Sequence, residues 1–259
     1  MKWPETLTIV RHGESQYNQL RQTKEADPTY QLFKKAYNRR RQDPETVREL
    51  AESLVKDGSL LVGRGDYETE LTEIGRHQAL TTGTRLGNII GLPDVVFVSP
   101  YRRTQHTYEL MTEGWPELSE VPGVEEERLR EQEHGLALLY SDWKIFQTLH
   151  PEQEQLRNLE GPYWYRYPQG ESVPDVRERS RSLLRTITRD YQEQDVLAVT
   201  HHLHILSLRA NLERLGANEF IRLDHEQKPI NCGVTVYRGE RDLGRDGKLV
   251  LDIYNKQLY

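Results

Sequence analysis

The sequence predicts an α/β fold with a mainly parallel central sheet. Short apolar runs alternate along the chain with longer segments whose apolar residues recur at helical spacing. Two of the runs, 94–98 and 195–200, are almost continuously apolar, as is typical of strands that are buried on both faces. Three expected strands end in residues able to carry chemistry, and in such sheets ligands bind beyond the carboxyl ends of the strands. We therefore expect a functional site at that edge.

The elements in the first part of the chain follow from local signals. A β-rich run at 6–10 ends in a loop that contains glycine, which predicts a strand, a loop and the start of a helix. Residues 19–65 are polar and predict a helical insertion of two helices, separated near Asp43 and Pro44, which fit an N-cap and a first helical residue. We expect the whole chain, 1–259, to form one domain that carries this insertion.

The second part of the chain alternates between strands and helices. A helix is expected after Thr72, a plausible N-cap, with Ile74, Ala79, Leu80 and Leu86 on its apolar face. The later elements are expected in this order: a strand at 94–98, a helix at 101–113, a short strand within 124–129, a helix around 142–149, a helix at 173–191, a strand at 195–200, a helix at 203–215, and a closing hairpin of 233–238 and 249–255.

Composition excludes several classes of function. The 259 residues contain 35 Lys and Arg against 41 Asp and Glu, a net charge of −6, which disfavours a nucleic-acid partner. No apolar run approaches the roughly 18 residues of a membrane span, and the first residues lack the apolar core of a signal peptide. We expect a cytoplasmic protein with no membrane partner. Cys232 is the only cysteine, so an intramolecular disulfide and a multi-thiolate metal site are excluded.

The residues at the strand ends suit phosphoryl transfer without a metal. His12 and His201 each follow an expected strand directly, Arg11 and Arg103 lie beside strand ends, and Glu131 follows the short strand. Guanidinium groups bind phosphate oxygens in pairs. A neutral histidine can accept a phosphoryl group covalently, and a carboxylic acid can protonate the departing alkoxide.

Six sequence blocks, in order, carry a resemblance to a known family. They resemble the motifs of the histidine phosphatase superfamily, also called phosphoglycerate-mutase-like proteins. The resemblance implies a three-layer α/β/α sandwich and no obligatory metal or cofactor. The blocks are RHGES at 11–15, LTEIGRHQA at 71–79, SPYRRTQHT at 99–107, LREQEHG at 129–135, PQGES at 168–172 and VTH at 199–201.

The resemblance also implies a role for each matching residue. His12 matches the nucleophile that becomes phosphorylated, and Glu131 matches the proton donor. His201 matches a second histidine that hydrogen-bonds the transferred phosphoryl group. The implied activity is hydrolysis of a small phosphorylated metabolite through a covalent phosphohistidine. The positions that match phosphate-binding residues are Arg11, Arg103 and Asn18.

Two features of the sequence next to His201 differ from the family motif or could suggest a metal site. The family commonly has glycine after this histidine, whereas His202 stands here, so we expect a side chain that narrows the pocket or contacts substrate. His201, His202 and His204 together could suggest metal ligands. No HExxH helix and no cysteine cluster accompany them, so no metal is expected.

Two alternatives to a phosphatase stay open at this point. A cofactor-dependent phosphoglycerate mutase would use the same core, but it needs further cationic groups for a second phosphate. The stretch from Gln132 to Gly135 after the acid differs from the mutase pattern, and Gly170 to Ser172 favours the phosphatase branch. A catalytically silent protein that binds a phosphate ligand is the third reading.

Overall fold

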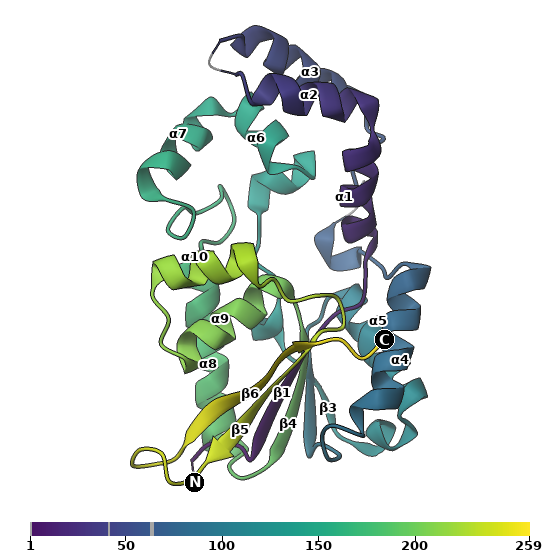
Figure 1. The fold of residues 1–259 in the computed structure, drawn as a ribbon, viewed down its shortest axis with the longest axis vertical. Coiled ribbons are helices and arrows are strands. Elements are labelled where there is room, and N and C mark those ends of the chain that lie inside the picture. Colours follow the sequence, from purple (N-terminus) through teal and green to yellow (C-terminus); the bar gives the residue numbers. More distant parts are fainter. Residues whose placement is uncertain (1, 41, 63–64) are drawn as a thin grey trace.

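The computed structural model describes residues 2–40, 42–62 and 65–259. Its strands are β1 Thr6–Arg11, β2 Val95–Val98, β3 Gly123–Glu125, β4 Asp195–Thr200, β5 Val234–Glu240 and β6 Lys248–Lys256. They form one sheet in the order β3-β2-β4-β1-β5-β6 (Figure 1). The first four strands in that order are parallel, and the last two join by antiparallel pairing. The predicted α/β class with a mainly parallel sheet is confirmed.

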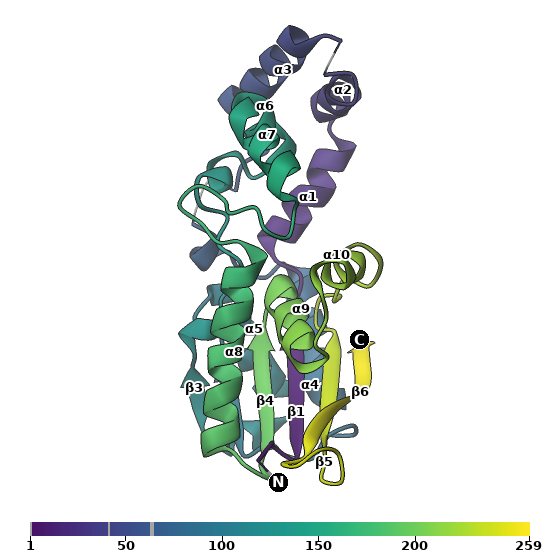
Figure 2. The same ribbon diagram turned by 90° about the vertical axis from the view of Figure 1, so that its left-hand side faces the viewer.

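Helices cover both faces of the sheet. Leu7 and Ile9 of β1 belong to one apolar core, whereas the neighbouring Val10 belongs to a second core on the other face. This alternation is what a central strand buried on both sides requires. The layers, seen in Figure 2, are built by α8 (Val173–Asp190) and α9 (His202–Leu212) on the first core, and by α4 (Glu73–Leu86) and α5 (Arg102–Gly114) on the second.

Helix α4 begins as predicted but packs differently. Thr72 caps it, but Ile74 and Leu80 are 59% and 38% exposed, so the prediction that they form its buried face was wrong. The helix instead brings its backbone close to its neighbours. A Cβ on Gly75 would lie 2.0 Å from a carbonyl oxygen of the loop after β1, and one on Gly83 would lie 2.3 Å from a carbonyl oxygen of α5. The small residues, not an apolar stripe, determine which side of α4 is buried.

A helical cap stands over the carboxyl ends of the strands (Figure 1). It consists of α1 (Gln16–Ala26), α2 (Pro28–Tyr37) and α3 (Pro44–Asp57), together with α6 (Trp143–Leu149) and α7 (Pro151–Glu160). These two parts of the chain share an apolar core that is separate from the cores of the sheet. The core is formed by Tyr30, Phe33, Tyr37, Val47, Ala51, Leu54, Leu60 and Ile145.

The break between cap helices α2 and α3 falls where the sequence predicts it. A side-chain oxygen of Asp43 accepts the N–H of Thr46 at 3.2 Å, and Pro44 is the first residue of α3. The expected strand within 124–129 is shorter, because only its first residues pair and the rest forms a 3₁₀ turn. The start of α1 follows the first strand and loop as predicted, but the sequence missed α7 and α10 (Ala217–Glu226) as separate helices. The 3₁₀ segments are η1 Asp66–Glu68, η2 Pro116–Glu120, η3 Glu127–Leu129 and η4 Gly135–Tyr140.

The chain closes with the predicted hairpin of β5 and β6. Strand β6 lies at the edge of the sheet, where Leu249 is buried and Val250 is exposed. Among the helices in the described part of the chain, none is long and apolar enough to cross a membrane.

Candidate active site

The carboxyl edge of the sheet gathers the strand-end residues that the sequence singles out. Arg11 is the last residue of β1, Ser99 directly follows β2, and His201 directly follows β4. The backbone N–H of His12 donates to the carbonyl oxygen of Thr200 at 2.9 Å, which ties the two histidine-bearing strand ends together. The rings of His12 and His201 lie with their centroids 5.2 Å apart.

His12 is held in one orientation. Its Nδ1 lies 2.7 Å from the carbonyl oxygen of Gly13, which can only accept, so the ring proton resides on Nδ1. The lone pair is therefore on Nε2, which accepts a hydrogen bond from the Nε–H of Arg103 at 3.3 Å. Burial, followed by the charges of Arg103 and Arg11, lowers the pKa of His12 well below its ordinary value. The ring is thus a neutral imidazole whose Nε2 lone pair is directed at Arg103.

His201 is fully buried and keeps one ring nitrogen without a partner. Its Nε2 lies 2.8 Å from the Ser99 hydroxyl, and its ring packs edge-on against Tyr101 with centroids 4.9 Å apart. Nδ1 has no hydrogen-bond partner among the described residues. Burial, then the charge of Arg103, lowers the pKa of His201 well below its usual range. When Ser99 donates to Nε2, the neutral ring carries its proton on Nδ1, free to donate to a bound oxygen.

Arg103 presents its guanidinium fork to an acidic side chain. One amino group donates to the Asp66 carboxylate at 2.9 Å and the other at 3.2 Å, in the paired geometry that a phosphate would also use. Arg103 is buried, and its guanidinium lies 4.8 Å from the ring centroid of Tyr101. A carboxylate therefore occupies the anion-binding face of Arg103.

Arg11 is a partly buried cation whose hydrogen-bond donors are incompletely satisfied. One of its amino groups donates to the carbonyl oxygen of Pro229 at 2.8 Å, but its Nε has no partner in the described structure. Burial lowers the pKa of Arg11 to about 10, against the opposing charge of Glu131. A buried unpartnered N–H is costly, and an anion bound beside it would remove that cost.

Glu131 is positioned by backbone and by a buried ion pair. One of its carboxylate oxygens accepts the N–H of Leu203, at the start of α9, at 3.1 Å, and the N–H of Gln132 at 3.0 Å. Arg179 of α8 donates to the carbonyl oxygen of Glu131 at 2.9 Å and is itself held by Glu171 at 2.9 and 3.0 Å. The acid is thus fixed relative to the end of β4.

Asn18 begins α1. Its side-chain oxygen accepts from the N–H and the hydroxyl of Ser15, both at 3.1 Å, and from the amide of Asn231 at 3.2 Å. Asn231 also donates to the carbonyl oxygen of His12 at 3.1 Å. The structure thus connects Asn18 to the loop that carries His12 through its oxygen and through Asn231.

His202 enters the site from the first turn of α9. Its Nε2 lies 2.8 Å from a carboxylate oxygen of Asp224 on α10. Burial opposes this pairing, but the contact with His202 prevails and lowers the pKa of Asp224. The side chain that replaces the usual glycine is therefore paired, and it borders the same cavity as Glu131.

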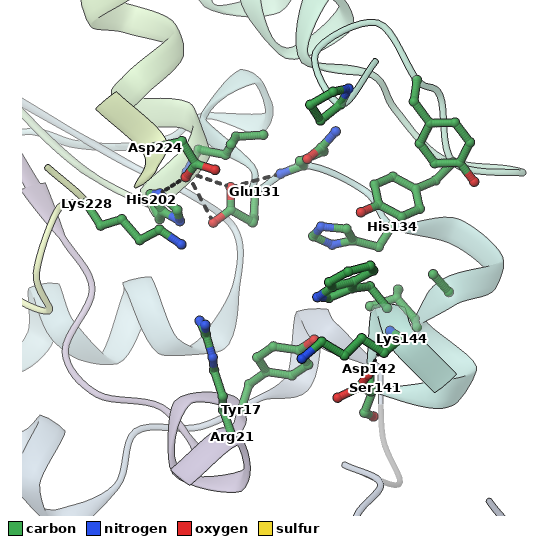
Figure 3. A pocket seen from close by; sticks show the side chains of 18 of the residues that line it. Tyr17, Arg21, Glu131, His134, Ser141, Asp142, Lys144, His202, Asp224 and Lys228 are labelled. Atoms are coloured by element: carbon green, nitrogen blue, oxygen red, sulfur yellow. Dashed lines mark hydrogen bonds and ion pairs between the residues drawn. The ribbon is translucent and has the colours of Figure 1, made fainter. Parts of the chain in front are cut away.

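A cavity of about 390 Å³ opens beside these residues (Figure 3). Glu131 and His202 line it, whereas His12, His201, Arg11 and Arg103 do not. The cap supplies much of the remaining wall. The cap residues include Tyr17, Arg21, Lys24, Tyr30, Trp143, Lys144 and Arg157.

The histidines at 201, 202 and 204 do not converge. His202 pairs with Asp224, whereas Nδ1 of His204 lies 3.2 Å from the hydroxyl of Thr200. Across residues 2–40, 42–62 and 65–259, no group of three or more His, Cys, Asp or Glu side chains is arranged to hold a metal ion.

An α/β/α sandwich that brings two histidines and two arginines together at the carboxyl edge of its sheet is typical of proteins that bind phosphate groups. The chain belongs to the histidine phosphatase superfamily, branch 1, whose model matches residues 51–245. The match includes Arg103, Glu131 and His201 and begins after His12.

Relatives carry both mutase-like and phosphatase names. A phosphoglycerate mutase-like protein of Arabidopsis thaliana is 28% identical over 213 residues, 74% of this chain and 70% of the relative. An acid phosphatase of Mycobacterium tuberculosis is 30% identical over 141 residues, 53% of this chain and 60% of that protein. The fold is similar to that of a mycobacterial glucosyl-3-phosphoglycerate phosphatase solved with VO3, with TM-score 0.61 and 24% identity over 97% of this chain and 99% of that one.

Three residues of the site were not anticipated from the sequence. Asp66 contacts Arg103, Arg179 holds the segment of Glu131, and Asp224 pairs with His202. Asp66 directly follows the polar insertion at 19–65, and neither it nor Asp224 carries a motif signal. Only Arg179 could have been suspected, as an arginine within the amphipathic helix next to the PQGES block.

Proposed function

We propose that this chain is a phosphomonoester hydrolase that acts through a covalent phosphohistidine at His12. The observation that carries the proposal is the state of His12: its neutral ring donates from Nδ1–H to the carbonyl oxygen of Gly13, and its Nε2 keeps the lone pair, which accepts from the Nε–H of Arg103. A nucleophile needs both the lone pair and a fixed direction of attack. The family includes proteins named as phosphatases and others named as mutase-like, and this proposal selects the first activity.

The reaction would proceed in two displacements. The phosphate binds against Arg11, Arg103 and the unpartnered Nδ1 of His201, and Nε2 of His12 attacks phosphorus as the ester P–O bond breaks. Glu131, protonated at this step, gives its proton to the departing oxygen. Glu131 then removes a proton from water, whose oxygen attacks phosphorus and breaks the P–N bond. Inorganic phosphate and neutral His12 result.

Substrate entry requires Asp66 to leave Arg103. Its carboxylate makes the two hydrogen bonds that phosphate oxygens would make, at 2.9 and 3.2 Å. The incoming dianion replaces it and adds contacts to Arg11 that Asp66 does not make. Asn18 supports the phosphate side through the nucleophile loop.

The proposal assigns the remaining parts of the chain as follows. The chain 1–259 forms one domain. Its insertion at 19–65 covers the cavity that receives the alcohol of a small phosphorylated metabolite. His202 shapes the end of this cavity next to Glu131. The chemistry described uses no metal or cofactor.

The test is phosphate release by the purified protein with a chelator present. Substrates are an aryl phosphate, sugar phosphates and phosphoglycerates. We expect release that His12→Ala reduces by at least about 10³-fold. His77→Ala, an exposed histidine of α4, is the matched control and should retain activity.

Other outcomes would contradict the proposal. Interconversion of 2- and 3-phosphoglycerate, primed by bisphosphoglycerate and without net release, would indicate a mutase. Binding of vanadate without turnover of any ester would indicate a silent binding protein. Release that survives His12→Ala would reject His12 as the nucleophile.

A further inference from the structure

We infer that the cavity beside Glu131 binds a second anionic group, carried by the alcohol part of the substrate, through Arg21, Lys144 and Lys228. The inference rests on the proposed function, which places the departing oxygen at Glu131 and hence the rest of the alcohol in this cavity. It adds a substrate class to that function: phosphomonoesters whose alcohol carries a carboxylate or a second phosphate.

The three cations converge from parts of the chain that are far apart in sequence. Arg21 comes from α1, Lys144 from α6, and Lys228 from the segment after α10. Figure 3 shows the side chains of all three directed into the cavity from different walls. Within the part of the chain that the structure describes, none of the three forms an ion pair or a side-chain hydrogen bond; Lys144 alone lies over a ring, that of Trp143.

The acidic side chains of the same cavity are already engaged. Glu25 pairs with Lys34 at 2.5 Å, and Asp224 with His202 at 2.8 Å. Asp142 caps α6, accepts the Tyr30 hydroxyl at 2.6 Å and lies 3.8 Å from Lys24. Arg21 and Lys144 also act on Glu25 through charge alone. Lys228 acts on Asp224 in the same way. The lining has five Lys and Arg side chains against four carboxylates, so with neutral histidines the cavity keeps an excess of positive charge, although the whole chain carries −6.

Unpaired cations on the walls of one cavity favour an anionic occupant. Guanidinium and ammonium groups form their strongest hydrogen bonds with carboxylate and phosphate oxygens. Burial raises the pKa of Tyr17 to about 12, so its phenol stays a neutral donor in the same wall. A substrate with a neutral alcohol would leave the three cations without an anionic group to bind.

The cavity is also separate from the phosphate side. Neither His12 nor Arg103 lines it, whereas Glu131 lines it and also acts through its charge on Arg11 of the phosphate side. A substrate bound across Glu131 would thus place its two anionic ends in different groups of cations. The ester phosphate meets Arg11 and Arg103, and the second anion meets the three cations of the cavity.

The experiment compares matched pairs of esters. Glycerol 3-phosphate and 3-phosphoglycerate differ in a hydroxymethyl or carboxylate end, and fructose 6-phosphate and fructose 1,6-bisphosphate differ in a second phosphate. We expect kcat/KM to favour the anionic member of at least one pair by about tenfold or more. The preference should shrink with added salt, because the cations are accessible to solvent.

Substitutions test whether the three cations cause the preference for anionic esters. Arg21→Gln, Lys144→Gln and Lys228→Gln together should reduce the ratio of the two kcat/KM values to about one. Lys56→Gln, an exposed lysine of cap helix α3 that does not line the cavity, is the control and should keep it. Equal kcat/KM within both pairs, or a preference that survives the triple variant, would overturn the inference.

A binding measurement separates this inference from the proposed function. Calorimetric titration of His12→Ala with the same four esters requires no turnover. Tighter binding of the anionic members, lost in the triple variant, would support the subsite even if no phosphate is released. Equal binding within both pairs would reject the subsite while leaving a phosphatase activity intact.

Discussion

The two sides of Glu131 are built in opposite ways. On the phosphate side, His12, His201 and Arg103 are at most 4% exposed and lie at or just beyond the ends of buried strands. On the cavity side, Arg21 and Lys228 are exposed and come from the helical cap and the segment after α10. The phosphate side resembles a protein core with fixed polar groups, and the cavity side resembles a surface.

This difference suggests how chemistry and selectivity are divided. Fixed donors in a dry site stabilise charge without reorganisation, which phosphoryl transfer requires. Solvated side chains on helices can change without disturbing the sheet, because their packing depends on the separate core of the cap. Substitutions on the phosphate side should therefore affect all substrates, and those on the cavity side only some.

The largest effect is expected for Glu131→Gln, at the boundary between the phosphate side and the cavity side. The amide cannot supply a proton, so kcat for alkyl phosphates should fall by about 10²–10⁴-fold. Aryl phosphates, whose leaving groups need less protonation, should lose much less in the first step. Single-turnover rates for a series of esters with rising leaving-group pKa provide the measurement. An equal loss for alkyl and aryl esters would argue against Glu131 as the acid.

The second effect concerns stability and is expected to be strongest for the fully buried histidines at and near the phosphate side. Burial lowers the pKa values of His12, His201 and His204 well below 6.5. Above pH 6.5 these groups are neutral in both states and have no effect. Below it the unfolded chain binds protons that the folded chain does not, so each group lowers the unfolding free energy by about 1.4 kcal/mol per pH unit until its folded pKa is reached.

Urea unfolding between pH 7.5 and 5 measures this dependence. His204→Gln keeps a polar group near Thr200 but removes one titrating ring, so its stability should fall less steeply with acid than that of the wild type. The exposed His77, changed to Gln, should leave the slope unaltered. Identical slopes for wild type and His204→Gln would contradict the assignment of a neutral buried ring.

The smallest effect is expected for Asp66→Asn. Removing the carboxylate that competes for Arg103 should lower the inhibition constant of inorganic phosphate by about three- to tenfold. Because Arg103 binds the ester phosphate, the gain should be equal for neutral and anionic alcohols. Glu68→Gln, an exposed acid of the same 3₁₀ segment, serves as control. An unchanged constant would show that Asp66 does not compete with phosphate.

The same contrast explains what could be predicted from the sequence. Strands β2 and β4 are apolar runs followed directly by Ser99 and His201, so local pattern alone placed these residues at one edge. Only the start of α1 was predicted, and α7 was not predicted at all, because both lack an apolar stripe: the only buried residue of α1 is Lys24, and α7 has none. Periodicity cannot reveal a helix that buries so little.

The remaining omissions are contacts at long range. Asp66 and Arg103 are 37 positions apart, and Arg179 and Glu131 are 48 positions apart, so no local spacing indicates either pair. The cavity cations depend on how α1, α6 and α10 are placed over the sheet. In contrast, α10 carries the buried Phe220 and Leu223 and could have been found by its periodicity.

The central claim is a covalent phosphohistidine at His12, and the most direct test is to trap it. The protein is mixed with an aryl phosphate, quenched in alkali within one turnover and analysed by peptide mass spectrometry. The account predicts one phosphoryl group, on the peptide that contains His12, and none in His12→Ala. A phosphoryl group on another residue, or phosphate release with no phosphorylated protein at any time, would contradict it.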